Sequence, residues 1–377
     1  MRILVLADVP PGTVGGAEVQ AWHLARQWAA NGHAVLIAGV NNVPRTEGRV
    51  TVVRLPLWQR SRLSRGVSYL LAVMWLVWRR RGGFEVVYCR FIREQAFAAS
   101  FARALGLLGC PVVVCPACAA QHGDVHRILR SSARSIWVRV LRRGGLTINA
   151  MSRQIREEIP LLGLADARIS DIPNGVLMPE LPPRSSSTAG PWKVLFLGRL
   201  VEQKGADVLL DAAQLLRQAG HDFVIEIVGD GPLREVLSER VASLGLEACV
   251  RLIGAKAPDA ISDVFLHADV FVLPSRYEGM PGVLLQALAY GLPVIATRVS
   301  GSEDIVSEDM GWLVPVDDPG ALADAFQEAF RHGRDRLRTM GARGRALAAR
   351  VYDNEVIARR YERLFEELIE SSHNTPR

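Results

Sequence analysis

The feature that most constrains the fold is an alternation that runs along nearly all 377 residues. Short apolar runs rich in β-branched residues alternate with patterns typical of helices. Such alternation predicts parallel β-sheets covered by helices on both faces. A stretch rich in Pro, Ser and Gly, residues 173–192, interrupts it once and indicates an interdomain linker. Because the chain is too long for one typical core, we predict an α/β protein with two doubly wound, Rossmann-like domains.

The expected elements and domains follow from this pattern. Residues 1–176 form the first domain, 177–192 the linker and 193–354 the second domain. Residues 355–377 form a C-terminal helix and tail that pack back toward the first domain. Sheets of this kind bind ligands at the carboxyl ends of their strands, so we expect the two domains to face a ligand across a cleft. Strands are predicted at 3–7, 34–38, 50–55, 86–89, 112–115, 146–150, 193–198, 224–228, 250–252, 270–273 and 293–297, and helices at 18–31, 68–80, 93–108, 153–161, 281–290 and 355–370.

Charge is distributed unevenly between the two halves. Residues 1–180 contain 23 Arg, no Lys and 11 Asp or Glu, for a net charge of +12, whereas the remainder carries a net charge of −6. A basic first half favours an anionic partner such as a phosphate, a membrane surface or a nucleic acid. We do not expect a nucleic-acid partner, because the chain shows neither a nucleic-acid-binding motif nor interleaved aromatic and basic residues.

Cysteine usage indicates a cytoplasmic protein. The five cysteines are odd in number, which argues against a disulfide framework. Cys115 and Cys118 have the CxxC spacing, but without a second such pair they are interpreted as buried small side chains rather than a metal or redox site. The first eight residues are typical of a strand that leads directly into a loop, and they lack the features of a signal peptide.

Residues 62–81, RLSRGVSYLLAVMWLVWRRR, allow two interpretations. Their apolar core, 67–78, is much shorter than the ~20 residues that cross a bilayer. One interpretation is a mostly buried helix. The other is a helix that lies on an anionic membrane, with its Arg ends at lipid phosphates and with Trp75 and Trp78 at the interface. The second would place the protein peripherally at the inner face of the cell membrane, and the sequence leaves both open.

Two glycine-containing loops follow predicted strands. Gly15 and Gly16 let the backbone approach a ligand closely, and the next helix presents its N–H groups to a phosphate or a sugar oxyanion. A structural turn explains this glycine pair about as well. In residues 198–205, Arg199 and Lys204 can converge on a diphosphate. Lysine is informative here, because the chain has only three among 45 basic residues and uses arginine almost everywhere else.

The stretch 274–297, PSRYEGMPGVLLQALAYGLPVIAT, carries the most chemical information. Its helix is expected at 281–290, with Pro281 in the first turn and Gly291 ending it. Glu278 then precedes the helix and points into the cleft, while the amides around Gly279 and Gly282 are available to an anion. Gln286 faces the same ligand more deeply. A ligand with a phosphate at the helix end and hydroxyls near Glu278 and Gln286 fits a nucleotide sugar.

These motifs resemble those of retaining glycosyltransferases of the large fourth family, which have the GT-B fold. Within that family they resemble the bacterial enzymes that make surface polysaccharides and exopolysaccharides. The matching elements are Gly15-Gly16-Ala17-Glu18, Pro173-Asn174-Gly175-Val176, Gly198-Arg199, Lys204-Gly205, Gly229-Asp230-Gly231-Pro232, Glu278-Gly279-x-Pro281, Gly291-x-Pro293-Val294 and the run from Val299 to Asp304.

The resemblance implies a nucleotide-diphosphate-sugar donor, most commonly a UDP-sugar, bound mainly by the second domain without a metal ion or other cofactor. It implies a glycan or lipid-linked acceptor held mainly by the first domain. The catalytic residues would be Arg199, Lys204 and Glu278. The donor would contact Gly16, Gly198, Gly229, Gly279, Met280, Pro281, Gly282 and Gln286, and the acceptor-side candidates are Gly15, Glu18, His122 and Asp124.

The chain departs from the family pattern at two places. The family signature is Glu-x7-Glu, whereas here it is Glu278-x7-Gln286, which predicts donor binding weaker by ~1–2 kcal/mol. The loop after the strand at 112–115 lacks the usual His arrangement, so His122 and Asp124 are candidates for acceptor binding or proton handling. A nucleotide-sugar epimerase, a phosphorylase on the same fold and a non-catalytic sugar-nucleotide binder stay open as alternatives.

Overall fold

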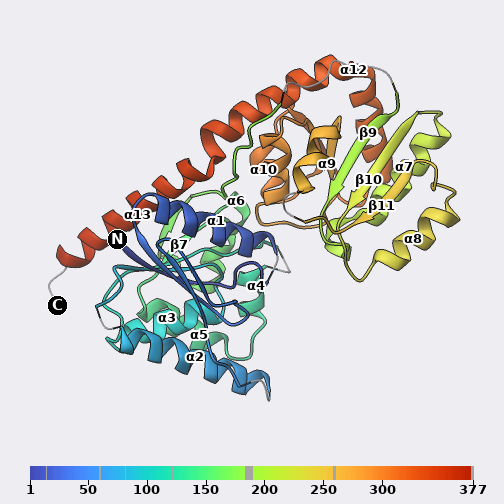
Figure 1. Ribbon diagram of the computed structural model, residues 1–377. Coiled ribbons are helices and arrows are strands. Elements are labelled where there is room, and N and C mark those ends of the chain that lie inside the picture. Colours follow the sequence, from blue (N-terminus) through green and yellow to red (C-terminus); the bar gives the residue numbers. More distant parts are fainter. Residues whose placement is uncertain are drawn as a thin grey trace. The chain divides into compact units, whose positions relative to one another are not determined.

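The chain forms two compact units. The computed structural model describes residues 1–13, 15–58, 61–80, 82–120, 123–182, 190–257 and 260–374. Unit 1 comprises Met1–Gly175 and Asn354–Arg377, and unit 2 comprises Val176–Asp353 (Figure 1). The described part of the expected linker therefore belongs to unit 2, and the last helix belongs to unit 1.

Unit 1 is built on a sheet of eight described strands in the order β3-β4-β2-β1-β5-β6-β7-β8. All neighbours are parallel except β3, which is antiparallel to β4 at the edge. The order changes direction between β1 and β5, which creates a crevice at the carboxyl ends of these strands. The strands are β1 (Arg2–Leu6), β2 (Ala34–Gly39), β3 (Arg45–Glu47), β4 (Val50–Arg54), β5 (Val86–Cys89), β6 (Val112–Val114), β7 (Thr147–Asn149) and β8 (Arg168–Ser170).

Helices cover both faces of this sheet (Figure 1). Helix α13 contacts α1, and α3 lies between α2 and α5 and contacts both. An aromatic cluster anchors α13, because the rings of Tyr361 and Phe365 lie 5.8 and 5.4 Å from the buried Trp28 ring of α1. The helices are α1 (Gly16–Ala30), α2 (Arg62–Arg79), α3 (Glu94–Ala104), α4 (Asp124–Leu129), α5 (Arg134–Arg143), α6 (Arg153–Glu158), the 3-10 helix η1 (Ile159–Leu162) and α13 (Asn354–Asn374).

Unit 2 contains a parallel sheet of six described strands in the order β11-β10-β9-β12-β13-β14. Its order changes direction between β9 and β12, so the loops that leave these two strands border the position where such sheets bind ligands. The strands are β9 (Trp192–Leu197), β10 (Phe223–Val228), β11 (Val250–Gly254), β12 (Val270–Leu273), β13 (Val294–Thr297) and β14 (Gly311–Val314).

The long helix α12 contacts both α7 and α10 in unit 2. Gly333 interrupts its helical backbone with a φ of 75°, so the helix is kinked. The described helices of unit 2 are the 3-10 helix η2 (Glu202–Lys204), α7 (Ala206–Gln218), α8 (Arg234–Ser243), α9 (Ile261–His267), α10 (Gly282–Ala289), α11 (Ser302–Ile305), α12 (Pro319–Leu347) and the π-helical turn η4 (Ala348–Tyr352).

Several predicted helix boundaries were wrong, for local reasons. Helix α2 begins six residues before the predicted start, because Ser61 and Ser64 form a reciprocal cap. The helix predicted at 153–161 ends at Glu158 and continues as η1, which contains Pro160, a residue without an N–H group. Helix α3 ends at Ala104, four residues before the predicted end.

Candidate functional site

The candidate site of unit 2 is built on the loops that follow β9 and β12. These loops touch through Gly205, whose φ is 64° and whose added Cβ would lie 2.0 Å from the carbonyl oxygen of Pro274. Only glycine fits such a close approach in a left-handed conformation. The contact brings the last residue of η2, Lys204, next to the loop that carries Glu278.

Lys204 and Glu278 form an ion pair. The Nζ atom of Lys204 lies 2.5 Å from Oε1 of Glu278, and the hydroxyl of the buried Ser275 donates to the same oxygen at 2.7 Å. The lysine side chain is 17% exposed and the glutamate side chain 8%. The sequence predicts that Glu278 points toward a ligand, and in the structure its carboxylate pairs with Lys204. The pair holds one cation and one anion together at the crevice of the sheet.

A network that the sequence did not reveal fixes the two loops. The side-chain amide of Gln203 donates to the carbonyl of Tyr277, and the Arg276 guanidinium binds both carboxylate oxygens of Asp207 at 2.7 and 3.0 Å. Arg276 also pairs with Asp317 at 2.7 Å. Although burial opposes the effect, the Arg276 guanidinium holds the pKa of the Asp207 carboxyl below its usual value. No local motif signals this network, because its bonded partners lie 41 to 74 positions apart in the sequence.

Arg199 lies at the end of β9 and is exposed. In the described part of the chain its guanidinium has no hydrogen bond or ion pair, so it is available to an anion. The neighbouring Gly198 meets Gly229 so closely that a Cβ added to Gly229, where φ is 139°, would lie 1.8 Å from the Gly198 carbonyl oxygen. The loops after β9 and β10 therefore touch backbone to backbone, and glycine is required at Gly229.

Helix α10 begins at Gly282, shortly after Glu278 of the Lys204–Glu278 ion pair. Pro281 is its N-cap rather than its first helical residue, and the helix runs over Gly282–Ala289. The first amides of a helix lack intrahelical acceptors and carry its positive dipole end, which favours an anion. Gly279, Met280 and Pro281 are buried, and Gln286 is half-buried. The side-chain amide of Gln286 makes no hydrogen bond within the described residues, which leaves it available to a ligand.

In the loop before α1, the sequence predicted that the start of the helix presents its N–H groups to a phosphate or a sugar oxyanion. Gly15 caps α1 without a side chain, and its backbone lies so close to Glu18 that an added Cβ would be 2.4 Å from Oε2. At Gly16, by contrast, no atom lies within 4 Å of an added Cβ. The carboxylate of Glu18 thus folds over the helix start and stabilises its positive end, which disfavours a second anion there.

Two carboxylates hold the loop after β6, for which the sequence predicts a role in acceptor binding. Asp124 is buried, and its oxygens accept from Nε of Arg93 at 2.7 Å and from the amide of Ala117 at 3.0 Å. Glu158, which the sequence did not single out, accepts from the amide of Ala120 at 2.7 Å. Both of Asp124's oxygens are engaged in positioning this loop. The other candidate of the loop, His122, lies outside the described residues.

Arg90 is another residue that the sequence analysis did not single out. It follows β5 at the crevice of the unit 1 sheet and is buried, with hydrogen bonds to Asn174 Oδ1 at 2.9 Å and Tyr88 Oη at 3.3 Å. Gly175, which follows Asn174 in the chain, exchanges two hydrogen bonds with the side chain of Gln20. The Pro-Asn-Gly motif is thereby fastened to the sheet of unit 1 where the chain leaves it.

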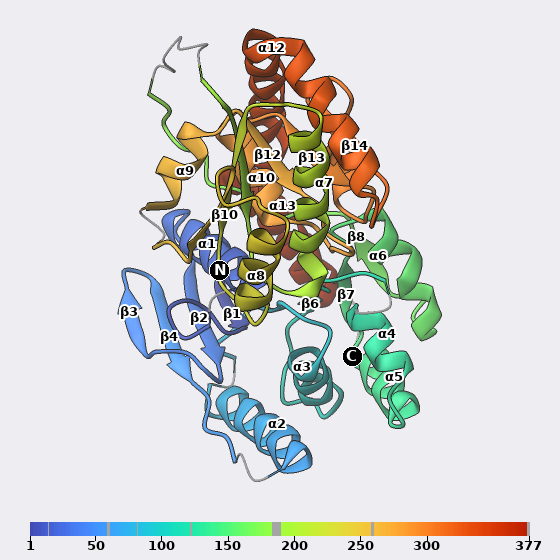
Figure 2. The ribbon, with the colours of Figure 1, turned by 90° about the vertical axis from the view of Figure 1, so that its right-hand side faces the viewer.

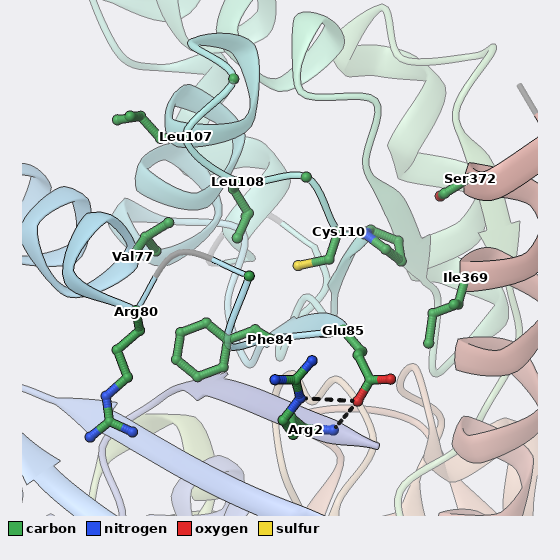
Figure 3. Close-up of a pocket in the computed structure, with 14 residues that line it drawn as sticks. Arg2, Val77, Arg80, Phe84, Glu85, Leu107, Leu108, Cys110, Ile369 and Ser372 are labelled. Carbon is green, nitrogen blue, oxygen red and sulfur yellow. Dashed lines mark hydrogen bonds and ion pairs between the residues drawn. The ribbon is translucent and has the colours of Figure 1, made fainter. Parts of the chain in front are cut away.

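A cavity of about 620 Å³ lies elsewhere in unit 1 (Figure 3). Arg2, Glu85 and Pro111 line it at the amino ends of β1, β5 and β6, and the amide of Arg2 donates to Glu85 at 2.8 Å. Burial raises the pKa of its Cys110 thiol to about 11. Parallel sheets bind ligands at the opposite strand ends. The cavity contains none of the residues predicted for the site.

Comparison with known proteins assigns the family. The model described as "Glycosyl transferase 4-like domain" matches residues 15–175, and that described as "Glycosyl transferases group 1" matches residues 178–346. The first match covers most of unit 1 without its C-terminal helix, and the second covers nearly all of unit 2. The chain belongs to the glycosyltransferases.

Individual relatives of this glycosyltransferase agree with the assignment. It is 38% identical over 140 residues to the amylovoran biosynthesis glycosyltransferase AmsK of Erwinia amylovora, which covers 35% of this chain and 34% of AmsK. The matches span about half or less of the length of the first curated relatives.

Solved structures confirm the predicted GT-B fold. Sucrose-phosphate synthase from Thermosynechococcus elongatus superimposes with a TM-score of 0.79 at 20% identity, covering 98% of this chain and 99% of that one. The Anabaena protein HepE in complex with UDP gives a TM-score of 0.76 at 18% identity, covering 98% of this chain and all of HepE. At such identities the likeness concerns the fold alone.

Proposed function

We propose that the protein is a retaining glycosyltransferase that moves a sugar from a nucleotide-diphosphate sugar, a UDP-sugar, to a glycan or lipid-linked acceptor in polysaccharide biosynthesis. The observation that carries this proposal is the Lys204–Glu278 pair at the crevice of the unit 2 sheet, beside the start of α10. The name of AmsK and the UDP bound to HepE support the reaction class and the donor.

The proposed roles follow from charge. When the bond between the sugar and the diphosphate breaks, negative charge gathers on the leaving group. Arg199, Lys204 and the first amides of α10 stabilise that charge, and Glu278 faces the sugar after Lys204 turns to the diphosphate. We propose that these cations make a metal ion unnecessary. A phosphate oxygen of the donor takes the acceptor proton, so the reaction needs no protein base.

We place the reaction in the cytoplasm. All five cysteines are free, and Cys89 and Cys115 are fully buried. Free buried thiols are typical of proteins in reducing compartments. Of the two cysteines with the CxxC spacing, Cys115 is buried as predicted, whereas Cys118 is half-buried.

A first prediction concerns Gln286. Its Glu variant should bind the donor more tightly by ~1–2 kcal/mol, because a carboxylate accepts charge-assisted hydrogen bonds from both hydroxyls of a ribose. Calorimetric titration of Gln286→Glu and of the wild type with the same nucleotide sugar measures the difference in Kd. Gln214→Glu, at another half-buried glutamine of unit 2, on helix α7, controls for the added charge. An unchanged Kd would remove Gln286 from the donor site.

The function itself is tested by product analysis. Purified protein is incubated with UDP-sugars and a glycan acceptor in the presence of EDTA, and proton NMR reports the anomeric configuration of the product. We expect transfer with the donor's configuration retained. Inversion would contradict the proposed mechanism. Conversion of the donor without an acceptor would indicate an epimerase, a requirement for free phosphate would indicate a phosphorylase, and loss of activity in EDTA would refute metal independence.

A further inference from the structure

Helix α2 exposes an apolar stripe on the surface of unit 1. Its inner side is in the core, where Tyr69, Val73 and Val77 are buried. On the outer side Val67, Leu71, Trp75 and Trp78 are 45, 49, 52 and 55% exposed. Steps of four, four and three residues place these four side chains on one face of a helix. At ~1.5 Å per residue, the stripe is about 16 Å long.

Arginines border this stripe at both ends. Arg65, Arg79 and Arg80 are exposed, and the segment 61–80 contains no Asp or Glu. The guanidinium of Arg79 lies 5.2 Å from the centroid of the Trp75 ring, so cation and indole are presented together. Two exposed tryptophans beside cations, without a nearby carboxylate on the helix, are typical of a surface that binds the boundary between acyl chains and anionic headgroups.

The same face of unit 1 carries a second basic helix. Helices α2, α3 and α5 lie side by side, with α3 in the middle (Figures 1 and 2). Helix α5 also contains no Asp or Glu, and it exposes Ile136. A shallow hollow of about 510 Å³ is lined by four of its arginines, Arg134, Arg139, Arg142 and Arg143. The positive charge therefore extends beyond the stripe.

We propose that the outer face of α2 docks on the surface of a bilayer that contains anionic phospholipid. Because its inner side is fixed in the core, α2 meets the bilayer side-on. Trp75 and Trp78 enter the headgroup region, and the arginines of α2 and α5 contact lipid phosphates. No helix in the described part of the chain is long and apolar enough to cross a membrane. This docking is independent of the proposed function, but it would bring the enzyme to a lipid-linked acceptor.

Co-sedimentation with vesicles tests the docking. The full chain is mixed with vesicles of phosphatidylcholine alone or of phosphatidylcholine and phosphatidylglycerol in equal parts. We expect binding only to the anionic vesicles, and weaker binding at higher salt. The pair Trp75→Ser and Trp78→Ser should lower the partition constant roughly tenfold or more. The pair Arg79→Gln and Arg80→Gln should lower it roughly thirtyfold at low salt.

Matched controls are taken from unit 2. Arg336→Gln with Arg343→Gln removes two exposed arginines of α12, and Leu215→Ser with Val236→Ser removes two exposed aliphatic side chains. Both control pairs should bind vesicles like the wild type. Thermal unfolding with and without UDP shows that every variant is folded and reports the nucleotide site separately.

Three results would overturn the proposal. The folded wild type could fail to bind anionic vesicles, or the α2 variants could bind them as well as the wild type does. Alternatively, sedimentation velocity without lipid could show self-association that the tryptophan substitutions abolish, with vesicle binding unchanged. That last result would assign the stripe to an interface between copies of the chain.

Discussion

Replacing Lys204 by alanine is expected to lower kcat by roughly 10²–10³-fold, with a much smaller change in substrate affinity. Lys204 is the cation that already lies against Glu278 at the crevice of the unit 2 sheet. The developing charge on the leaving diphosphate needs this cation more than the bound ground state does, so the loss falls mainly on the chemical step. Steady-state kinetics with varied donor and acceptor measures both effects.

The matched control is Lys193→Ala. Lys193 is another of the three lysines. It is exposed at the amino end of β9, whereas Lys204 follows the carboxyl end of that strand. Its removal changes the net charge equally and should leave kcat unchanged. Because Lys204→Ala also leaves Glu278 without its cation, thermal unfolding is measured in parallel to separate lost stability from lost catalysis. An effect confined to the acceptor KM would contradict the role proposed for Lys204.

The second large effect is expected from Gly205→Ala. Two penalties combine at this position, a left-handed backbone with φ of 64° and a Cβ only 2.0 Å from the carbonyl oxygen of Pro274. We expect unit 2 to lose roughly 2–4 kcal/mol of stability. Activity should fall as well, since the clash pushes the loop of Lys204 away from that of Glu278. Urea unfolding followed by fluorescence measures the loss.

Gly220→Ala separates the two penalties. Gly220 has a similar φ of 79°, but nothing lies within 4 Å of its added Cβ. Its alanine variant should therefore lose only the free energy of unfolding that the left-handed conformation costs, roughly 1–2 kcal/mol. Equal losses in the two variants would mean that the contact with Pro274 places no constraint on the loops.

Much of the fold was predictable because strand–helix alternation is a local signal. The β-branched runs that became β1, β5 and β12 were located to within one residue. The edge strands β3, β8 and β14 were missed, because their sequences RTE, RIS and GWLV lack the run of β-branched apolar residues that marks a strand. Helix α12 was not predicted as an element of its own; its pattern is interrupted where Gly333 kinks the helix.

The site was predictable where one residue type was unusual for its place. Lys204 was singled out because arginine replaces lysine almost everywhere else, and the structure places it against Glu278. Ser275 gave no such signal, because a serine in a loop is ordinary until the fold puts its hydroxyl 2.7 Å from a buried carboxylate. The pairing of Arg276 with Asp207 and Asp317 likewise depends on long-range contacts that one sequence does not reveal.

Helix α2 shows how an interpretation from sequence can be correct for only one side of an element. Burial was correct for Val73 and Val77, whereas the exposed Trp75 and Trp78 keep the membrane interpretation as a proposal. Sequence alone does not separate the two faces, because both are apolar. Only the packing of α2 against α3 decides which side of the helix is covered.

Nucleotide binding by unit 2 is the central claim, and a thermal-shift titration tests it most directly. The purified protein is titrated with UDP, GDP, ADP and dTDP, each with and without Mg²⁺. A ligand that binds only the native state raises its stability by RT ln(1 + [L]/Kd). We predict that UDP raises the melting temperature equally with and without Mg²⁺, and that Arg199→Ala reduces the shift. If no nucleotide shifts the melting temperature of folded protein, the site assigned to Arg199, Lys204 and Glu278 does not bind a nucleotide sugar.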